Sequence, residues 1–128
     1  MPDIIHEDNH IIVVIKPQNV PTQADESGDI DLLNQIKEYI KLKYDKPGNV
    51  FVGLVHRLDR PTGGIMVFAK TSKAAARLSE QIAGGEFVKK YMAVVVGAPI
   101  ERAARLKHYL LKNAAKNLKR FLRAQKRH

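Results

Sequence analysis

The chain has 128 residues, 45% of them hydrophobic, which suits one soluble globular domain with a buried core and excludes a disordered chain. It has no cysteine, which excludes disulfide bonds, thiolate metal sites and a cysteine nucleophile. No apolar stretch approaches the roughly 20 residues of a membrane helix, and the acidic N-terminus does not resemble a signal peptide. We therefore expect a cytoplasmic protein with no membrane partner.

The net charge of +9 is concentrated at the C-terminal end of the sequence. Residues 1–100 hold 12 basic and 12 acidic side chains, whereas residues 101–128 hold 10 basic side chains and a single acid, Glu101. Such a basic segment is typical of proteins that bind nucleic acid or anionic lipid. A solvated basic end without a partner explains the charge equally well.

Runs of apolar and β-branched residues predict strands, and apolar residues at helical spacing predict helices. The expected elements are strands at 3–7 and 10–16, a helix at 31–44, strands at 50–55 and 64–69, a helix at 72–83, a strand at 87–96 and a basic amphipathic helix from 102 to 128. Asp29 or Asp31 is the expected N-cap of the first helix, and Ser72 that of the second. Because strands and helices do not alternate regularly, we expect an α+β fold: a mainly antiparallel mixed sheet, two packed helices and a basic C-terminal helix.

The loop between the two central strands carries a dense group of chemically active side chains. Asp59 lies among His56, Arg57 and Arg60, three potential cations that would keep its carboxylate ionised. A positioned carboxylate can act as a nucleophile or a base, and arginine suits phosphate contacts. These residues therefore indicate a site for a phosphate-bearing substrate. A structural Asp–Arg pair that pins a turn explains the same residues somewhat better when spacing alone is considered.

The segment from His56 to Lys70 resembles the central motif of the RluA-type pseudouridine synthases. That motif runs His-Arg-Leu-Asp, two variable residues, Thr, a small residue and Gly, followed by an apolar strand that ends in Ala-Lys. Two further blocks resemble family motifs in the same order, at residues 7–21 and at residues 89–95. The resemblance covers about residues 3–112.

The resemblance implies an enzyme that isomerises uridine in ribosomal or transfer RNA to pseudouridine, with no cofactor and no metal. The target nucleotide would be flipped out of its stack. Asp59 would be the catalytic nucleophile, attacking the ribose or removing a ribose proton, and Tyr91 would pack on the uracil and could remove the last proton. Contacts with the substrate are implied for His56, Arg57, Arg60, Thr62 and Lys89.

Several of these residues also have simpler explanations. Without the resemblance, Tyr91 in an apolar run would be assigned to the core. His56 could hydrogen-bond the backbone and hold the loop. Lys16 and Pro17 suit a structural role at a strand exit, and Lys70 suits a solvated strand end.

One later family motif, with a basic residue and a His-Gln-hydrophobic-Arg run, has no match in the chain. We therefore expect residues 1–112 to be the N-terminal part of an incomplete pseudouridine synthase catalytic domain, and residues 113–128 to be a basic tail without a family counterpart, in a shortened gene product. Its activity would be impaired, because the missing parts would supply sheet partners and half of the cleft. Two alternatives stay open: a catalytically inactive RNA-binding protein, and a small structural protein that self-associates through exposed strand edges.

Overall fold

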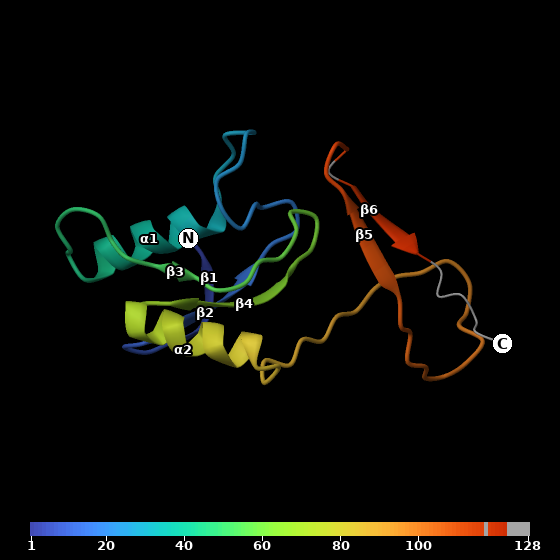
Figure 1. Cartoon of the computed structure of the whole chain (residues 1–128). Coiled ribbons are helices and arrows are strands. Elements are labelled where there is room, and N and C mark those ends of the chain that lie inside the picture. The colour runs from blue at the N-terminus through green and yellow to red at the C-terminus, as the bar shows by residue number, and fades with distance from the viewer. Residues whose placement is uncertain (117, 123–128) are drawn as a thin grey trace. The chain divides into compact units, whose positions relative to one another are not determined.

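The computed structural model describes the backbone of residues 1–116 and 118–122 and the side chains of residues 1–116. The chain divides into two compact units, residues 1–90 and the part that begins at Tyr91 (Figure 1). The first unit contains the sheet, both helices and the Asp59 loop, so it carries most of the candidate site. Within the described residues, no helix is both long enough and apolar enough to cross a membrane.

A four-stranded antiparallel sheet forms the centre of the first unit. Its strands are β1 (Asp3–Glu7), β2 (Ile11–Lys16), β3 (Gly53–Leu54) and β4 (Gly64–Ala69), in the spatial order β1-β2-β4-β3. β2 and β4 pair along their whole length, from Ile11 opposite Ala69 to Lys16 opposite Gly64. β3 is much shorter than the predicted strand at 50–55, and it leaves most of one edge of β4 to other partners.

Helix α1 (Leu32–Lys43) packs on one face of this sheet and completes the core. Alternate residues of β2 and β4 point to this face, and residues at helical spacing on α1 meet them. Each large apolar side chain buried here contributes roughly 1.5–3 kcal/mol. The Asp31 carboxylate accepts a hydrogen bond of 3.0 Å from the Asn34 N–H, so Asp31 is the N-cap. The fully buried apolar residues of the unit are Ile12, Val14, Leu32, Ile36, Ile40, Met66, Phe68 and Ala69.

Helix α2 (Ser72–Ala83) lies on the opposite side of the sheet from α1 (Figure 1). It packs closely against β3 because Gly53 has no side chain: a Cβ there would lie 3.0 Å from the Ala75 Cβ. The N-cap of α2 is Thr71 and not the predicted Ser72. Thr71 keeps an extended backbone and its hydroxyl accepts from the Ala74 N–H at 3.1 Å, whereas Ser72 is already helical. On the α2 side, the cross-strand neighbours Ile15 and Ile65 stay 39% and 66% exposed.

The predicted strand at 87–96 is wrong: the residues there form no strand. A strand needs a neighbour for its backbone hydrogen bonds, and most of this apolar segment is exposed without one in the part of the chain that the structure describes. Sequence pattern alone does not reveal whether such a neighbour is present.

The predicted helix from 102 to 128 is also wrong over its described residues, while residue 117 and residues 123–128 lie outside them. The second unit instead holds a hairpin of β5 (Tyr109–Asn113) and β6 (Leu118–Leu122). The Asn113 side chain accepts from the N–H groups of Ala115 and Lys116, at 3.1 and 3.3 Å, and so reverses the chain. This hairpin spans residues 112 and 113, between which the sequence predicted the boundary of the family domain and the basic tail. That domain boundary stays a prediction.

Candidate active site

Asp59 lies in the loop that joins β3 to β4, at the end of the sheet where Lys16 pairs with Gly64. The Thr62 N–H donates to the Asp59 carbonyl at 2.9 Å and closes a tight turn. The Asp59 side chain is exposed, and within residues 1–90 its carboxylate forms no hydrogen bond or ion pair. The turn therefore presents an unoccupied carboxylate to solvent.

Backbone carbonyls on both sides of Asp59 are held by the last residue of β2 and by the segment that follows it. The Thr22 hydroxyl donates to the Leu58 carbonyl at 2.7 Å. The Arg60 carbonyl accepts from the Asn19 N–H at 2.8 Å and from the Lys16 ammonium at 3.0 Å. The carbonyls of Leu58 and Arg60, the residues on either side of Asp59, are thus held in place while the Asp59 carboxylate is exposed.

Lys16 is the buried cation of this site. Its side chain is fully buried, and its ammonium also donates to the carbonyls of Pro17 and Val20, at 3.1 and 2.7 Å. Burial lowers the pKa of Lys16 and the positive charge of Arg60 lowers it further, whereas the negative charge of Asp59 raises it. Lys16 therefore interacts electrostatically with Asp59. The sequence assigned Lys16 only a structural role, although its place on the inward face of β2, in line with Ile12 and Val14, was a signal.

The close approach of the two loops depends on Gly63. A Cβ at this position would lie 3.1 Å from the Gln18 Cγ and 3.3 Å from the Lys16 carbonyl oxygen. A side chain there would push the Asp59 loop away from the segment that holds it.

The Arg60 side chain turns away from Asp59 and binds a different loop. Its guanidinium donates to the Ser27 hydroxyl at 3.1 Å, lies 3.5 Å from the Asp25 carboxylate and forms a hydrogen-bonded ion pair with Asp29. The hydrogen bond to Asp29 is the main reason that the pKa of Arg60 is raised. Arg60 is therefore not the cationic partner of Asp59 that the sequence suggested.

The His56 side chain binds the edge of β4 just beyond the point where β3 ends. Its Nε2 accepts a hydrogen bond of 3.1 Å from the Val67 N–H, which requires that nitrogen to be unprotonated. Burial, followed by the positive charge of Lys89, lowers the pKa of His56. The simpler explanation offered for His56, a backbone hydrogen bond that holds the loop, is confirmed. In this arrangement His56 is neutral and supports the loop, and it is not a cation beside Asp59.

The other predicted site residues differ in their exposure and in their contacts. Arg57 is exposed and has no polar partner among the described residues, whereas Thr62 is half-buried in the Asp59 turn. The Phe87 ring links Lys89 to His56, since its centroid lies 5.9 Å from the Lys89 ammonium and 5.2 Å from the His56 ring centroid. Tyr91 begins the second unit and is 66% exposed there. The substrate roles of these side chains stay predictions.

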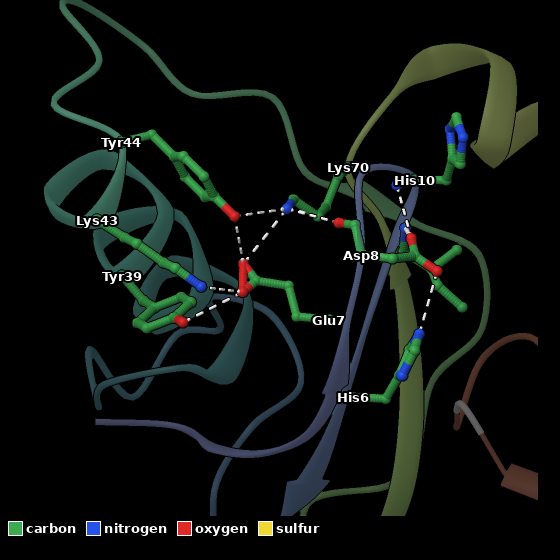
Figure 2. A network of polar contacts seen from close by, with 9 residues as sticks. His6, Glu7, Asp8, His10, Tyr39, Lys43, Tyr44 and Lys70 are labelled. Atoms are coloured by element: carbon green, nitrogen blue, oxygen red, sulfur yellow. Dashed lines mark hydrogen bonds and ion pairs between the residues drawn. The ribbon is translucent and has the colours of Figure 1, made fainter.

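A second polar cluster lies at the other end of the β2–β4 pair, around Glu7 (Figure 2). The nearly buried Glu7 carboxylate accepts from Lys43 at 2.7 Å, from Lys70 at 3.3 Å and from the hydroxyls of Tyr39 and Tyr44 at 3.2 and 3.1 Å. Lys70 is only 9% exposed, so the solvated role suggested for it is wrong. The cluster ties β1 to α1 and to the end of β4, and it has no contact with the Asp59 loop among its described bonds.

The described residues contain no group of three or more His, Asp or Glu side chains that could hold a metal ion. The side chains on the Asp59 loop can instead supply a carboxylate, a guanidinium and hydrogen-bonding groups. These are suited to nucleophilic or proton-transfer chemistry on a phosphate-bearing substrate.

The chain matches the family model for RNA pseudouridylate synthase over residues 10–128, a range that runs past the predicted boundary at residue 112. Ribosomal large subunit pseudouridine synthase D of Yersinia pestis is 39% identical over 98 residues, which are 74% of this chain and 29% of that protein. Ribosomal large subunit pseudouridine synthase C of Buchnera aphidicola subsp. Acyrthosiphon pisum is 27% identical over 124 residues, 97% of this chain and 38% of that protein.

The structure of human RNA pseudouridylate synthase domain containing 4 shares the fold. It matches with a TM-score of 0.55 and 24% identity, over 66% of this chain and 30% of the human one. The chain therefore spans well under half the length of the curated relatives and of the solved structure that it matches.

Proposed function

Because the chain belongs to the RNA pseudouridylate synthase family, we propose that it takes part in converting uridine in RNA to pseudouridine, with Asp59 as the reacting carboxylate. The relatives above are named for the large ribosomal subunit, so large-subunit ribosomal RNA is the proposed substrate. The observation that supports the proposal is the combination at Asp59 of an exposed carboxylate and of carbonyls on the two neighbouring residues that Lys16, Asn19 and Thr22 hold.

In the proposed reaction the target uridine is flipped out of its stack. Asp59 attacks the ribose, or removes a ribose proton to give a glycal, and the bond between the ribose and N1 of uracil breaks. The uracil rotates and its C5 forms the new bond to the ribose. In the first route the bond between Asp59 and the ribose breaks as this bond forms, and in the second Asp59 returns the proton that it removed from the ribose. The C5 proton is then removed, with Tyr91 as the candidate base, and N1 ends protonated. Arg57 is proposed to fill the space that the base has left.

The test is pseudouridine formation on ribosomal RNA that lacks the modification, with the wild-type chain beside Asp59→Asn. Asp45→Asn, which removes another exposed carboxylate in the same unit, is the matched control. Product from the wild type and Asp45→Asn but not from Asp59→Asn would support the proposal. Equal product from all three would exclude Asp59 as the nucleophile.

Absence of product from every chain would count against catalysis by these 128 residues, and binding then separates the alternatives. RNA affinity that falls steeply with salt and does not depend on Asp59 would indicate an RNA-binding protein. Mass that rises with protein concentration, without RNA affinity, would instead indicate self-association through the edges of the sheet.

A further inference from the structure

The segment that holds the Asp59 loop carries a charge that is unexpected beside an RNA site. Residues 17–36 contain four acidic side chains, Asp25, Glu26, Asp29 and Asp31, and no Lys or Arg. Like charges repel over about 10 Å at moderate ionic strength, so these carboxylates disfavour an RNA backbone near Asp59. The acidic loop, defined here as residues 25–29, is tied to the Asp59 turn by the side chain of Arg60.

The acidic loop is organised as a receptor for this guanidinium. The Asp25 carboxylate accepts from the Ser27 N–H at 2.9 Å and from the Ser27 hydroxyl, and that hydroxyl accepts from the Asp29 N–H at 3.1 Å. These bonds orient three oxygen-bearing side chains toward Arg60. Two carboxylates and a hydroxyl on one guanidinium present oxygen acceptors like those that a phosphate presents to arginine.

The bonds between Arg60 and the loop are also readily exchanged. The side chains of Arg60, Asp25 and Asp29 are 38%, 42% and 54% exposed, so water and salt reach all three. Exposed ion pairs of this kind are weak and are screened by added salt. An incoming phosphate therefore does not need to displace a strong, desolvated contact to reach the guanidinium.

Building on the function proposed above, we propose that Arg60 binds an RNA phosphate and that the acidic loop binds its guanidinium when RNA is absent. Asp25 and Asp29 occupy its guanidinium in the free protein, and a backbone phosphate next to the target uridine replaces them. Because Arg60 directly follows Asp59 in the chain, this exchange couples phosphate binding to the turn that presents the nucleophile. The Arg60 guanidinium binds either the acidic loop or an RNA phosphate, but not both at once. Weakening its bonds to the loop therefore strengthens its binding to RNA.

The main test is a double-mutant cycle on affinity for a short uridine-containing single-stranded RNA, measured by fluorescence anisotropy at fixed salt. The Asp25→Asn/Asp29→Asn protein is expected to bind about two- to fivefold more tightly than the wild type, the range set by exposed ion pairs. In the Arg60→Gln background the same pair of changes is expected to bring no gain, because the released guanidinium is gone.

The matched control is Glu26→Gln/Glu38→Gln, which removes the same amount of charge from two residues that have no polar contact with Arg60 among the described residues. It is expected to change affinity much less than the Asp25/Asp29 pair. An equal gain in this control, or a gain that persists with Arg60→Gln, would show general charge repulsion and overturn the exchange.

A second measurement needs no RNA and separates this proposal from the proposed function. A protease that cleaves after Glu should cut at Glu26 faster when inorganic phosphate releases the loop, and faster still in Arg60→Gln without phosphate. Chloride at the same ionic strength is the control. If phosphate and chloride change the rate of cleavage at Glu26 equally, the proposed exchange is wrong. If phosphate acts specifically but no variant binds RNA, the proposed function fails while the phosphate exchange stands.

Discussion

The hydroxyl of Thr22 donates a 2.7 Å hydrogen bond to the carbonyl of Leu58, the residue directly before Asp59. The two residues are far apart in the sequence, and both lie in segments without regular secondary structure. Thr22 is only 5% exposed, so the Leu58 carbonyl has a partner that is shielded from water. The position of the Asp59 turn thus depends on side chains outside the His-Arg-Leu-Asp motif.

Replacing Thr22 by Val is therefore expected to destabilise the first unit by about 1–3 kcal/mol, the cost of leaving a partly buried carbonyl without its donor. Urea denaturation followed by circular dichroism measures this change. Thr22→Ser keeps the hydroxyl and should retain most of the lost stability. If Thr22→Ser is as unstable as Thr22→Val, the lost methyl packing and not the hydrogen bond accounts for the effect.

Replacing Lys16 by Met removes the donor of three carbonyls while it keeps most of the buried volume. We expect a loss of about 2 kcal/mol or more in the free energy of unfolding, because the carbonyls of Pro17 and Val20 lose this buried partner. Lys41→Met, at an exposed position of α1, is the control and should stay within about 0.5 kcal/mol of the wild type. An unchanged stability of Lys16→Met would mean that the cost of burying the charge cancels its hydrogen bonds.

The elements that the sequence predicted correctly are those whose signal is local. α1 and α2 have caps and helical spacing, and β2 and β4 are continuous apolar runs, so neighbouring residues are sufficient to identify them. The errors came from pairing across the chain. The segment at 87–96 has the composition of a strand but pairs with no other strand in the part of the chain that the structure describes, and the Asn113 turn makes a hairpin of a tail whose sequence pattern is helical.

The candidate site divides in the same way. The motif from His56 to Gly64 located the loop, since its residues are consecutive. The sequence did not locate the partners of these residues, because Lys16, Thr22 and Asp29 reach the loop only through the fold. The pairing of Arg60 with Asp29 in place of Asp59 depends on the path of the acidic loop, which no periodicity encodes.

His56 is expected to make the protein less stable as the solution becomes mildly acidic. Its pKa in the folded state is lowered below the ordinary value of 6.5, chiefly by burial. As pH falls through 6.5 the unfolded chain takes up a proton at His56 more readily than the folded one, so unfolding is favoured.

Unfolding free energies measured from about pH 7.5 to about pH 5.5 should therefore fall more for the wild type than for His56→Gln, whose amide oxygen can still accept from the Val67 N–H. His10→Gln, at an exposed histidine, is the control and should keep the slope of the wild type. Parallel slopes for the wild type and His56→Gln would show that His56 takes up its proton equally in both states.

The Glu7 cluster is expected to give the protein a second, more acidic dependence on pH. Burial raises the pKa of Glu7, but hydrogen bonds from Lys43, Tyr44 and Lys70 outweigh it and hold the pKa below the ordinary 4.5. A carboxylate with a lowered pKa stabilises the fold fully above its unfolded value, and this contribution is lost as pH falls through the folded one.

Glu7→Gln should consequently lower the unfolding free energy by ~2 kcal/mol near neutral pH, because its neutral amide weakens bonds to charged donors. The gap between the wild type and Glu7→Gln should narrow as pH falls below 4.5, since the wild-type carboxyl then becomes neutral as well. Glu80→Gln, at an exposed position on α2, is the control and should show no such gap. A gap that stays constant into acid would mean that shape complementarity, and not the charge on Glu7, ties β1 to α1.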